Sequence, residues 1–134
     1  MIDSQLELTD RYLLSAIGSA TTTTLSNEYD FSADNHNLGL SGLRLRAQLS
    51  GDSVTCNNTI QVIVQDAPDS SGSSGTYANL ISSIVHPAAD CVAGFVLMDV
   101  GLPTDMQQWV RVQIASGANL TTATYLSVYI YTTK

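Results

Sequence analysis

Four segments of the chain alternate apolar and polar residues with a period of two. They are residues 43–49, 59–65, 109–115 and 125–131. Successive side chains of a β-strand point to opposite faces, so this period predicts half-buried strands with one apolar face each. The aliphatic residues of each segment are expected to form the core, and the polar and aromatic residues between them the outer faces.

Less regular segments between these four predict further strands. Residues 66–75 are dense in Ser, Gly and Asp and are expected to form a flexible loop. Gly94 is expected to mark a β-bulge. Short strands with turns between them predict an all-β, antiparallel two-sheet sandwich, a jelly roll of about eight strands. The further strand candidates are residues 12–17, 19–26, 77–85 (a strand or one short helix) and 92–100.

The first twelve residues are expected to lie outside this sandwich. Leu6 and Leu8 alternate with polar neighbours, which favours an extended arm or strand, while the spacing of Leu6 and Leu13 leaves a short helix open. A chain of 134 residues suits one domain. We therefore expect an extended N-terminal arm over residues 1–12 and a single β-sandwich domain over residues 13–134.

Composition agrees with this fold class. Charged residues make up 13% of the chain, with two Glu and one Lys. Solvated helices are usually covered by Glu–Lys pairs, which this chain cannot supply, so a helical bundle or coiled coil is disfavoured. The length is sufficient for a core without a metal or disulfide, and Cys56 and Cys91 are expected to be two buried thiols.

The charge distribution argues against several partners. The net charge is −7, and residues 47–110 contain no Lys or Arg. Such a chain lacks the basic surface that binds phosphate backbones or anionic lipids, so we expect no nucleic acid and no membrane partner. No apolar segment approaches the roughly 20 residues of a bilayer span, and the charged residues near the start disfavour a leader.

Catalytic and metal-binding patterns are not found. His36 and His86 are the only histidines, and no regular spacing supplies three or four zinc ligands. Residues 72–75 (GSSG) lack the Lys of a phosphate loop, and no nucleophile elbow occurs. We therefore expect no enzyme, no cofactor and no metal site.

Several residues are candidates for contacts with a partner. Trp109 and Arg111 share the outer side of their strand, where Trp109 contacts a partner or glycan, or packs under a loop or second sheet. Three tyrosines share one face of the last strand, where they belong to the core or to a subunit interface. Two neighbouring arginines suggest a site that pairs with carboxylates, the alternative being a solvated face. Together with the arm residues, the candidates are Ile2, Leu6, Leu8, Tyr12, Arg44, Arg46, Trp109, Arg111, Tyr125, Tyr129 and Tyr131.

The order of several weak motifs resembles a family of phage capsid cement (decoration) proteins with a jelly-roll fold. The chain opens with MIDSQLELTD, and residues 60–66 (IQVIVQD) lead into a Ser/Gly loop. Leu102-Pro103 precedes residues 109–112 (WVRV), and a Thr-rich turn and strand close the chain. Residues 11–14 (RYLL) depart from the family, which commonly has Gln and small residues there.

This resemblance implies a homotrimer on the outside of an icosahedral shell, bound to the major capsid protein near three-fold positions. It implies no catalysis and no cofactor, and a location on the outer capsid surface of the virion after synthesis in the host cytoplasm. The alternative is a β-sandwich binding module of a phage tail or host-attachment apparatus that recognises a glycan or a protein receptor. A small β-fold enzyme would require a convergent pair of carboxylates in a cleft.

Overall fold

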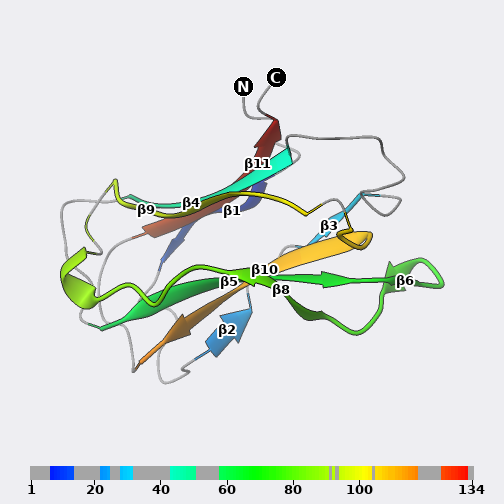
Figure 1. Cartoon of the computed structure of the whole chain (residues 1–134), viewed down its shortest axis with the longest axis horizontal. Coiled ribbons are helices and arrows are strands. Elements are labelled where there is room, and N and C mark those ends of the chain that lie inside the picture. Colours follow the sequence, from blue (N-terminus) through cyan, green and yellow to red (C-terminus); the bar gives the residue numbers. More distant parts are fainter. Residues whose placement is uncertain are drawn as a thin grey trace.

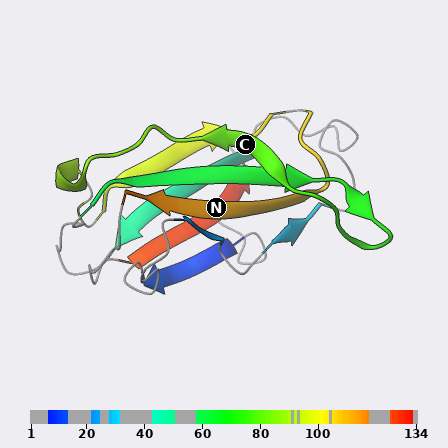
Figure 2. The same ribbon diagram turned by 90° about the horizontal axis from the view of Figure 1, so that it is seen from below.

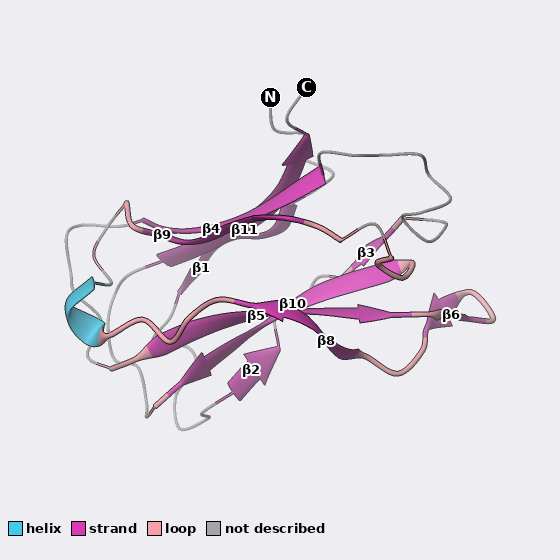
Figure 3. Cartoon of the chain, viewed as in Figure 1, coloured by secondary structure: helices cyan, strands magenta, loops and turns pink. Residues whose placement is uncertain are grey.

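The chain folds into two antiparallel β-sheets that pack against each other, as the sequence predicts (Figure 1). The fold is known from a computed structural model. It describes residues 7–13, 22–24, 28–31, 43–50, 58–90, 92, 94–103, 105–117 and 125–132. Strands dominate these residues, and the helical element among them is a single 3₁₀ turn, Ala88–Asp90 (Figure 3).

One sheet, called here the β4 sheet, has the strand order β1-β11-β4-β9. The other, the β5 sheet, has the order β2-β10-β5-β8, and β3 also pairs with β10. Figure 2 views the sandwich from the side of the β5 sheet. The strands of the β4 sheet are β1 (Glu7–Leu13), β4 (Leu43–Ser50), β9 (Val96–Gly101) and β11 (Tyr125–Thr132). Those of the β5 sheet are β2 (Thr22–Thr24), β3 (Tyr29–Asp30), β5 (Ile60–Ala67), β8 (Ala78–Ser82) and β10 (Trp109–Ser116).

The core lies between the two sheets and consists of the aliphatic faces that the alternation predicts. In β4 every second residue from Leu43 to Leu49 is buried, and the residues between are half-buried. The inner faces of β5, β10 and β11 repeat this pattern. Burial of each large aliphatic side chain contributes roughly 1.5–3 kcal/mol. The largest fully buried side chains are Leu45, Leu49, Ile60, Val62, Met106, Ile114, Leu126 and Ile130.

Residues 66–75, predicted to form a loop, contain regular β-structure. Strand β5 continues to Ala67, and a hairpin follows, built from β6 (Asp69–Ser70) and β7 (Ser73–Ser74). Ser71 and Gly72 form its turn with φ values of 54° and 88°. Two consecutive positive φ angles belong to a type I′ turn, whose twist matches that of the flanking strands. The end of β5 and a short hairpin therefore replace part of the predicted loop.

The bulge expected at Gly94 lies elsewhere. Gly94 has a φ of 85° and precedes β9, in a turn where its N–H donates to the Leu49 carbonyl at 2.7 Å. The register of β9 shifts between Val96 and Met98, opposite Ala47 and Gln48 of β4, so the irregularity falls inside the strand. The segment 77–85, left open between strand and helix, contains strand β8.

His86 connects the two sheets where β8 and β9 form their edges. Its backbone pairs with Ile60 through hydrogen bonds of 2.8 and 3.1 Å. Its Nε2–H donates to the Leu97 carbonyl of β9 at 2.8 Å, and its ring meets Phe95 edge to face at 5.3 Å. His86 is therefore a buried link between the two sheets.

Strand β1 begins within the predicted arm and continues past its end. It is the edge strand of the β4 sheet and pairs with β11 from Glu7 to Leu13. The register sets Tyr12 opposite Leu126, whose side chain is fully buried. Residues 1–6, including Ile2 and Leu6, lie outside the described residues. The extended arm and the domain boundary at residue 13 stay predictions.

Candidate functional site

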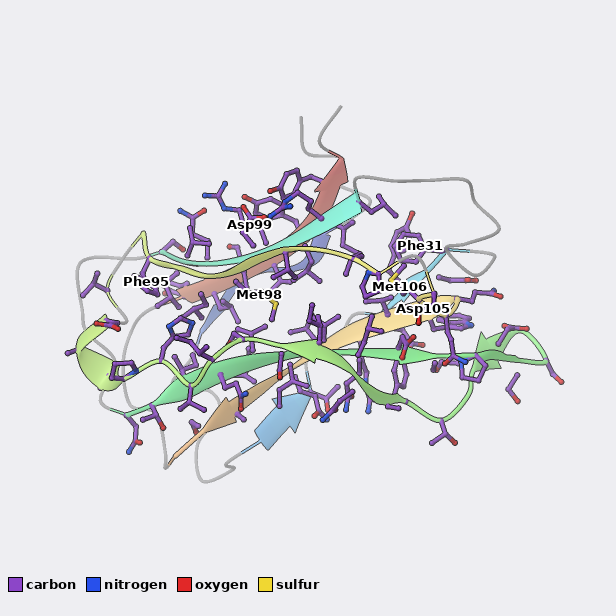
Figure 4. The ribbon with its side chains drawn as sticks, in the orientation of Figure 1. Phe31, Phe95, Met98, Asp99, Asp105 and Met106 are labelled. Carbon is purple, nitrogen blue, oxygen red and sulfur yellow. The ribbon has the colours of Figure 1, made fainter. Side chains whose placement is uncertain are left out.

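The outer surface of the β4 sheet brings together five of the predicted contact residues. Cross-strand pairing sets Tyr131 beside Arg44, and Tyr129 beside Arg46. The strand β9 adds Asp99 beside Arg46. We call this surface the tyrosine–arginine face; its residues, all half-buried, are Arg44, Arg46, Asp99, Tyr125, Tyr129 and Tyr131. Figure 4 shows Asp99 on the outside of this sheet and Met98 pointing between the sheets.

Asp99 organises this face because it accepts hydrogen bonds from two other strands. The Tyr131 hydroxyl donates to Asp99 Oδ1 at 2.6 Å, and Arg44 Nε donates to the same oxygen at 3.0 Å. Arg44 Nη2 also donates to the Asp99 backbone carbonyl at 2.9 Å. Charge-assisted hydrogen bonds of this kind are short and directional. They hold Tyr131 and Arg44 in fixed positions on the surface.

These contacts shift the pKa values of Asp99, Tyr131 and Arg44. Partial burial raises the pKa of Asp99, but hydrogen bonds from Tyr131 and Arg44 outweigh it, so the pKa is lowered overall. The hydrogen bond to Asp99, and then burial, raise the pKa of the Tyr131 phenol. Hydrogen bonds with Tyr131 and Asp99 raise the pKa of Arg44. At neutral pH the carboxylate and guanidinium are charged and the phenol is a donor.

Arg46 is held less tightly than Arg44. Its Nε lies 3.9 Å from Asp99 Oδ2, beyond hydrogen-bond distance, and this buried nitrogen has no hydrogen-bond partner among the described residues. Its side chain remains 35% exposed. Asp99 therefore accepts hydrogen bonds from Arg44 and only weakly neutralises the charge of Arg46. A carboxylate from outside could pair with the exposed part of the Arg46 guanidinium.

The outer surface of the β5 sheet holds Trp109 and Arg111 in a separate polar network. Arg111 Nε donates to Gln65 Oε1 at 2.8 Å, and its guanidinium lies 4.0 Å from the centre of the Tyr77 ring. The Tyr77 hydroxyl donates to Glu28 Oε2 at 2.5 Å. Burial, and then this hydrogen bond, raise the pKa of Tyr77. Arg111 therefore forms its contacts within the protein: a hydrogen bond to Gln65 and a cation–π contact with Tyr77.

Trp109 is anchored to the hairpin that follows β5. Its indole Nε1–H donates to Asp69 Oδ1 at 3.1 Å. The indole is half-buried, and Asp69, beside the turn of the hairpin, is exposed. Trp109 therefore contacts a local segment of the chain, and its contact with a partner or glycan stays a prediction.

The predicted interface residues therefore occupy two outer faces. Arg44, Arg46 and the tyrosines lie on the β4 sheet, and Trp109 and Arg111 on the β5 sheet. Leu8 and Tyr12 belong to β1, at the edge of the β4 sheet. Both faces also contain contact residues that the sequence pattern did not indicate: Asp99, Tyr77, Glu28 and Asp69. Asp99 carried one signal, since it is the only charged residue in the apolar segment 92–100.

Neither a metal-binding cluster nor a membrane-spanning helix occurs among the described residues. They contain no group of three or more His, Cys, Asp or Glu side chains that could hold a metal ion. None of their helical segments is long and apolar enough to cross a membrane. No protein-family model and no curated protein sequence matches this chain.

Proposed function

We propose that this protein is a structural virion protein that binds the outside of a phage capsid as a homotrimer and bridges neighbouring major capsid subunits. The observation that carries the proposal is the tyrosine–arginine face. Aromatic residues and arginines are enriched at the centres of protein interfaces, and here Asp99 holds one of each, Tyr131 and Arg44, through hydrogen bonds. Arg46 offers the exposed part of its guanidinium to a carboxylate of the shell.

The proposal includes a jelly-roll topology, and the strand order supports it. For this comparison, β2 and β3 count as one strand because both pair with β10, and the β6–β7 hairpin is left out. The remaining eight strands are numbered 1 to 8 in chain order. The β4 sheet then has the order 1-8-3-6, and the β5 sheet the order 2-7-4-5. Two interleaved Greek keys produce this arrangement. It agrees with the resemblance of the sequence motifs to capsid cement proteins.

A protein that bridges shell subunits has to supply binding free energy and does not have to catalyse a reaction. A filled capsid is under outward stress, and each bridging copy adds contacts at a junction. Three linked copies bind with avidity, because the second and third contacts form at a high effective concentration. This role needs no catalysis, cofactor, nucleic acid or membrane, and it belongs on the outer surface of the virion.

The test is co-sedimentation with empty shells. Arg46→Gln removes one positive charge from the tyrosine–arginine face, and Gln113→Glu changes the net charge equally on the opposite sheet. We expect Arg46→Gln to weaken shell binding about tenfold, as one charge-assisted hydrogen bond of ~1.5 kcal/mol is lost. Gln113→Glu should bind as the unmodified protein does. Equal binding by both variants would contradict the assignment of this face.

A second candidate function is glycan recognition by a tail or host-attachment module. Trp109 and Tyr77 lie near the carboxylates of Asp69 and Glu28 on the β5 sheet. Sugars stack on aromatic rings and hydrogen-bond to carboxylates, so this surface has suitable chemistry. A glycan array probed with the protein and with Trp109→Ala tests it. Signals that vanish in the variant, without shell binding, would favour this function over the first.

A further inference from the structure

An open hollow lies on the outer face of the β5 sheet, where β5 begins and β10 ends. Its volume is about 200 Å³. Cross-strand pairing sets Gln61 opposite Ala115 at this point. The lining residues are Thr59, Gln61, Val85, Ala115, Ser116 and Gly117. Pockets that hold a whole drug-sized ligand usually measure roughly 300–1,000 Å³, so this hollow admits one group of a larger molecule.

Two polar side chains of the hollow keep one acceptor and one donor unused. Gln61 Nε2 donates to the Ser83 carbonyl at 2.9 Å, and the amide oxygen of Gln61 has no partner among the described residues. Thr59 Oγ1 accepts the Gly117 N–H at 3.0 Å, and a hydroxyl that accepts can still donate its own proton. The hollow can therefore pair with one N–H and one carbonyl oxygen of a ligand.

Two aliphatic side chains lie beside these polar groups. Val85 is 56% exposed, although the backbone next to it is fixed by the His86 N–H, which donates to the Ile60 carbonyl at 2.8 Å. Ala115 contributes a single methyl group and leaves space in front of it. Apolar walls with a few polar groups are typical of small-molecule sites. A group that matches the hollow carries an N–H, a carbonyl and a methyl group, which is the composition of an acetamido group.

The surroundings of the hollow favour one kind of molecule as the carrier of this group. No lining residue is charged, and the net charge of −7 repels an acidic ligand, so a neutral ligand is favoured. Both β5 and β10 are interior strands, and their backbones already pair with neighbouring strands. A peptide that adds a strand requires a free sheet edge, which this position does not offer. A sugar bound through side chains requires no such edge.

We propose that the hollow binds the acetamido group of a neutral N-acetylated sugar. The acetamido N–H donates to Gln61 Oε1, its carbonyl oxygen accepts from the Thr59 hydroxyl, and its methyl group contacts Val85 and Ala115. Strand β10 runs from Trp109 to Ser116, which at ~3.3 Å per residue separates this site from Trp109 by roughly 23 Å. The inference therefore rests neither on the shell-binding face nor on the surface around Trp109.

The test is an NMR titration of isotope-labelled protein with N-acetylglucosamine and with glucose, which has a hydroxyl group in place of the acetamido group. We expect N-acetylglucosamine to shift the backbone amide signals of Gln61, Ala115 and Gly117. The dissociation constant should be millimolar, because so small a hollow contacts few ligand atoms. Glucose should bind at least about tenfold more weakly, since it leaves Gln61 and Thr59 without their partners.

Two variants test whether binding occurs in the hollow. Ala115→Leu fills the hollow and should abolish the shifts. Ala78→Leu is the matched control, because Ala78 is an exposed strand residue outside the hollow. Thr59→Val removes the hydroxyl, keeps the shape of the side chain and should weaken binding about tenfold. The amide spectrum of each variant without sugar shows whether it is folded.

The possible results separate this inference from the proposed function. Shifts confined to the hollow, lost in Ala115→Leu and kept in Ala78→Leu, support the inference whether or not the protein binds shells. The inference is overturned by the absence of shifts, by equal shifts with glucose, by shifts that occur only near Trp109, or by a folded Thr59→Val variant that binds as the unmodified protein does. Stronger shifts with N-acetylalanine methylamide, which has the amide and methyl groups without a sugar ring, also overturn it. Failure to co-sediment with empty shells overturns only the proposed function.

Discussion

Tyr131 on β11 donates a 2.6 Å hydrogen bond to Asp99 on β9, although β4 lies between these two strands. Arg44 of β4 donates to the same carboxylate oxygen. One carboxylate therefore connects three adjacent strands across the outer face of the β4 sheet. Within a sheet, a strand normally forms hydrogen bonds only with the strands directly beside it. This side-chain contact reaches one strand further and so resists separation of the edge strand β9.

Removing the charge of Asp99 should destabilise the fold. In Asp99→Asn the Tyr131 hydroxyl retains an acceptor, but Arg44 and Arg46 lose their carboxylate. We expect a loss of about 1–2 kcal/mol, the range for charge-assisted hydrogen bonds that water partly screens. Urea denaturation measures it. The exposed Asp105→Asn is the matched control, and equal midpoints for the two variants would refute the role of Asp99.

The same carboxylate predicts a pH dependence. The pKa of Asp99 is lower in the folded state than in the unfolded chain. Its stabilising contribution is therefore complete above the unfolded value of about 3.9 and is lost as the pH falls through the folded pKa. The stability difference between the unmodified protein and Asp99→Asn should be constant from pH 7 to about 5 and shrink below about 4. A difference that persists undiminished to pH 2 would contradict the lowered pKa.

Gly72 should be difficult to replace, although it has open space around it. No atom lies within 4 Å of a Cβ built at this position, but the φ is +88°. Side chains disfavour this backbone conformation, so Gly72→Ala should cost about 1 kcal/mol through strain alone. Gly101→Ala is the control, because its Cβ would meet only Arg44 Nη1 at 4.0 Å. Thermal melts of both variants decide the point, and equal melting temperatures would argue against the type I′ turn.

The imidazole of His86 should stabilise the side of the sandwich where the edge strands β8 and β9 lie. His86→Phe keeps a ring against Phe95 and removes the donor to the Leu97 carbonyl. The buried carbonyl is left without its hydrogen bond, which should cost about 1–3 kcal/mol. Hydrogen exchange should then increase in β9 more than in β10, which lies inside the other sheet. Uniform exchange across the two strands would show that the link is unimportant.

The local pattern of residues predicted the four alternating strands, β4, β5, β10 and β11, and their faces correctly. Leu45, Val112 and Ile130 were expected in the core because they alternate with polar or aromatic neighbours, and all three are fully buried. Alternation is decisive because adjacent residues of a strand point to opposite sides whatever the strand pairs with. The same rule placed Arg44 and Tyr131 on an outer face.

Tertiary structure decided which outer faces exist and which side chains meet on them. Arg44 and Asp99 are 55 residues apart in the chain, and Tyr77 and Glu28 are 49 apart. No local pattern encodes such pairs, because they depend on strand order and register. The same reason explains why the sequence did not indicate the link through His86, and why it did not indicate that the candidate contacts lie on the outer faces of two different sheets.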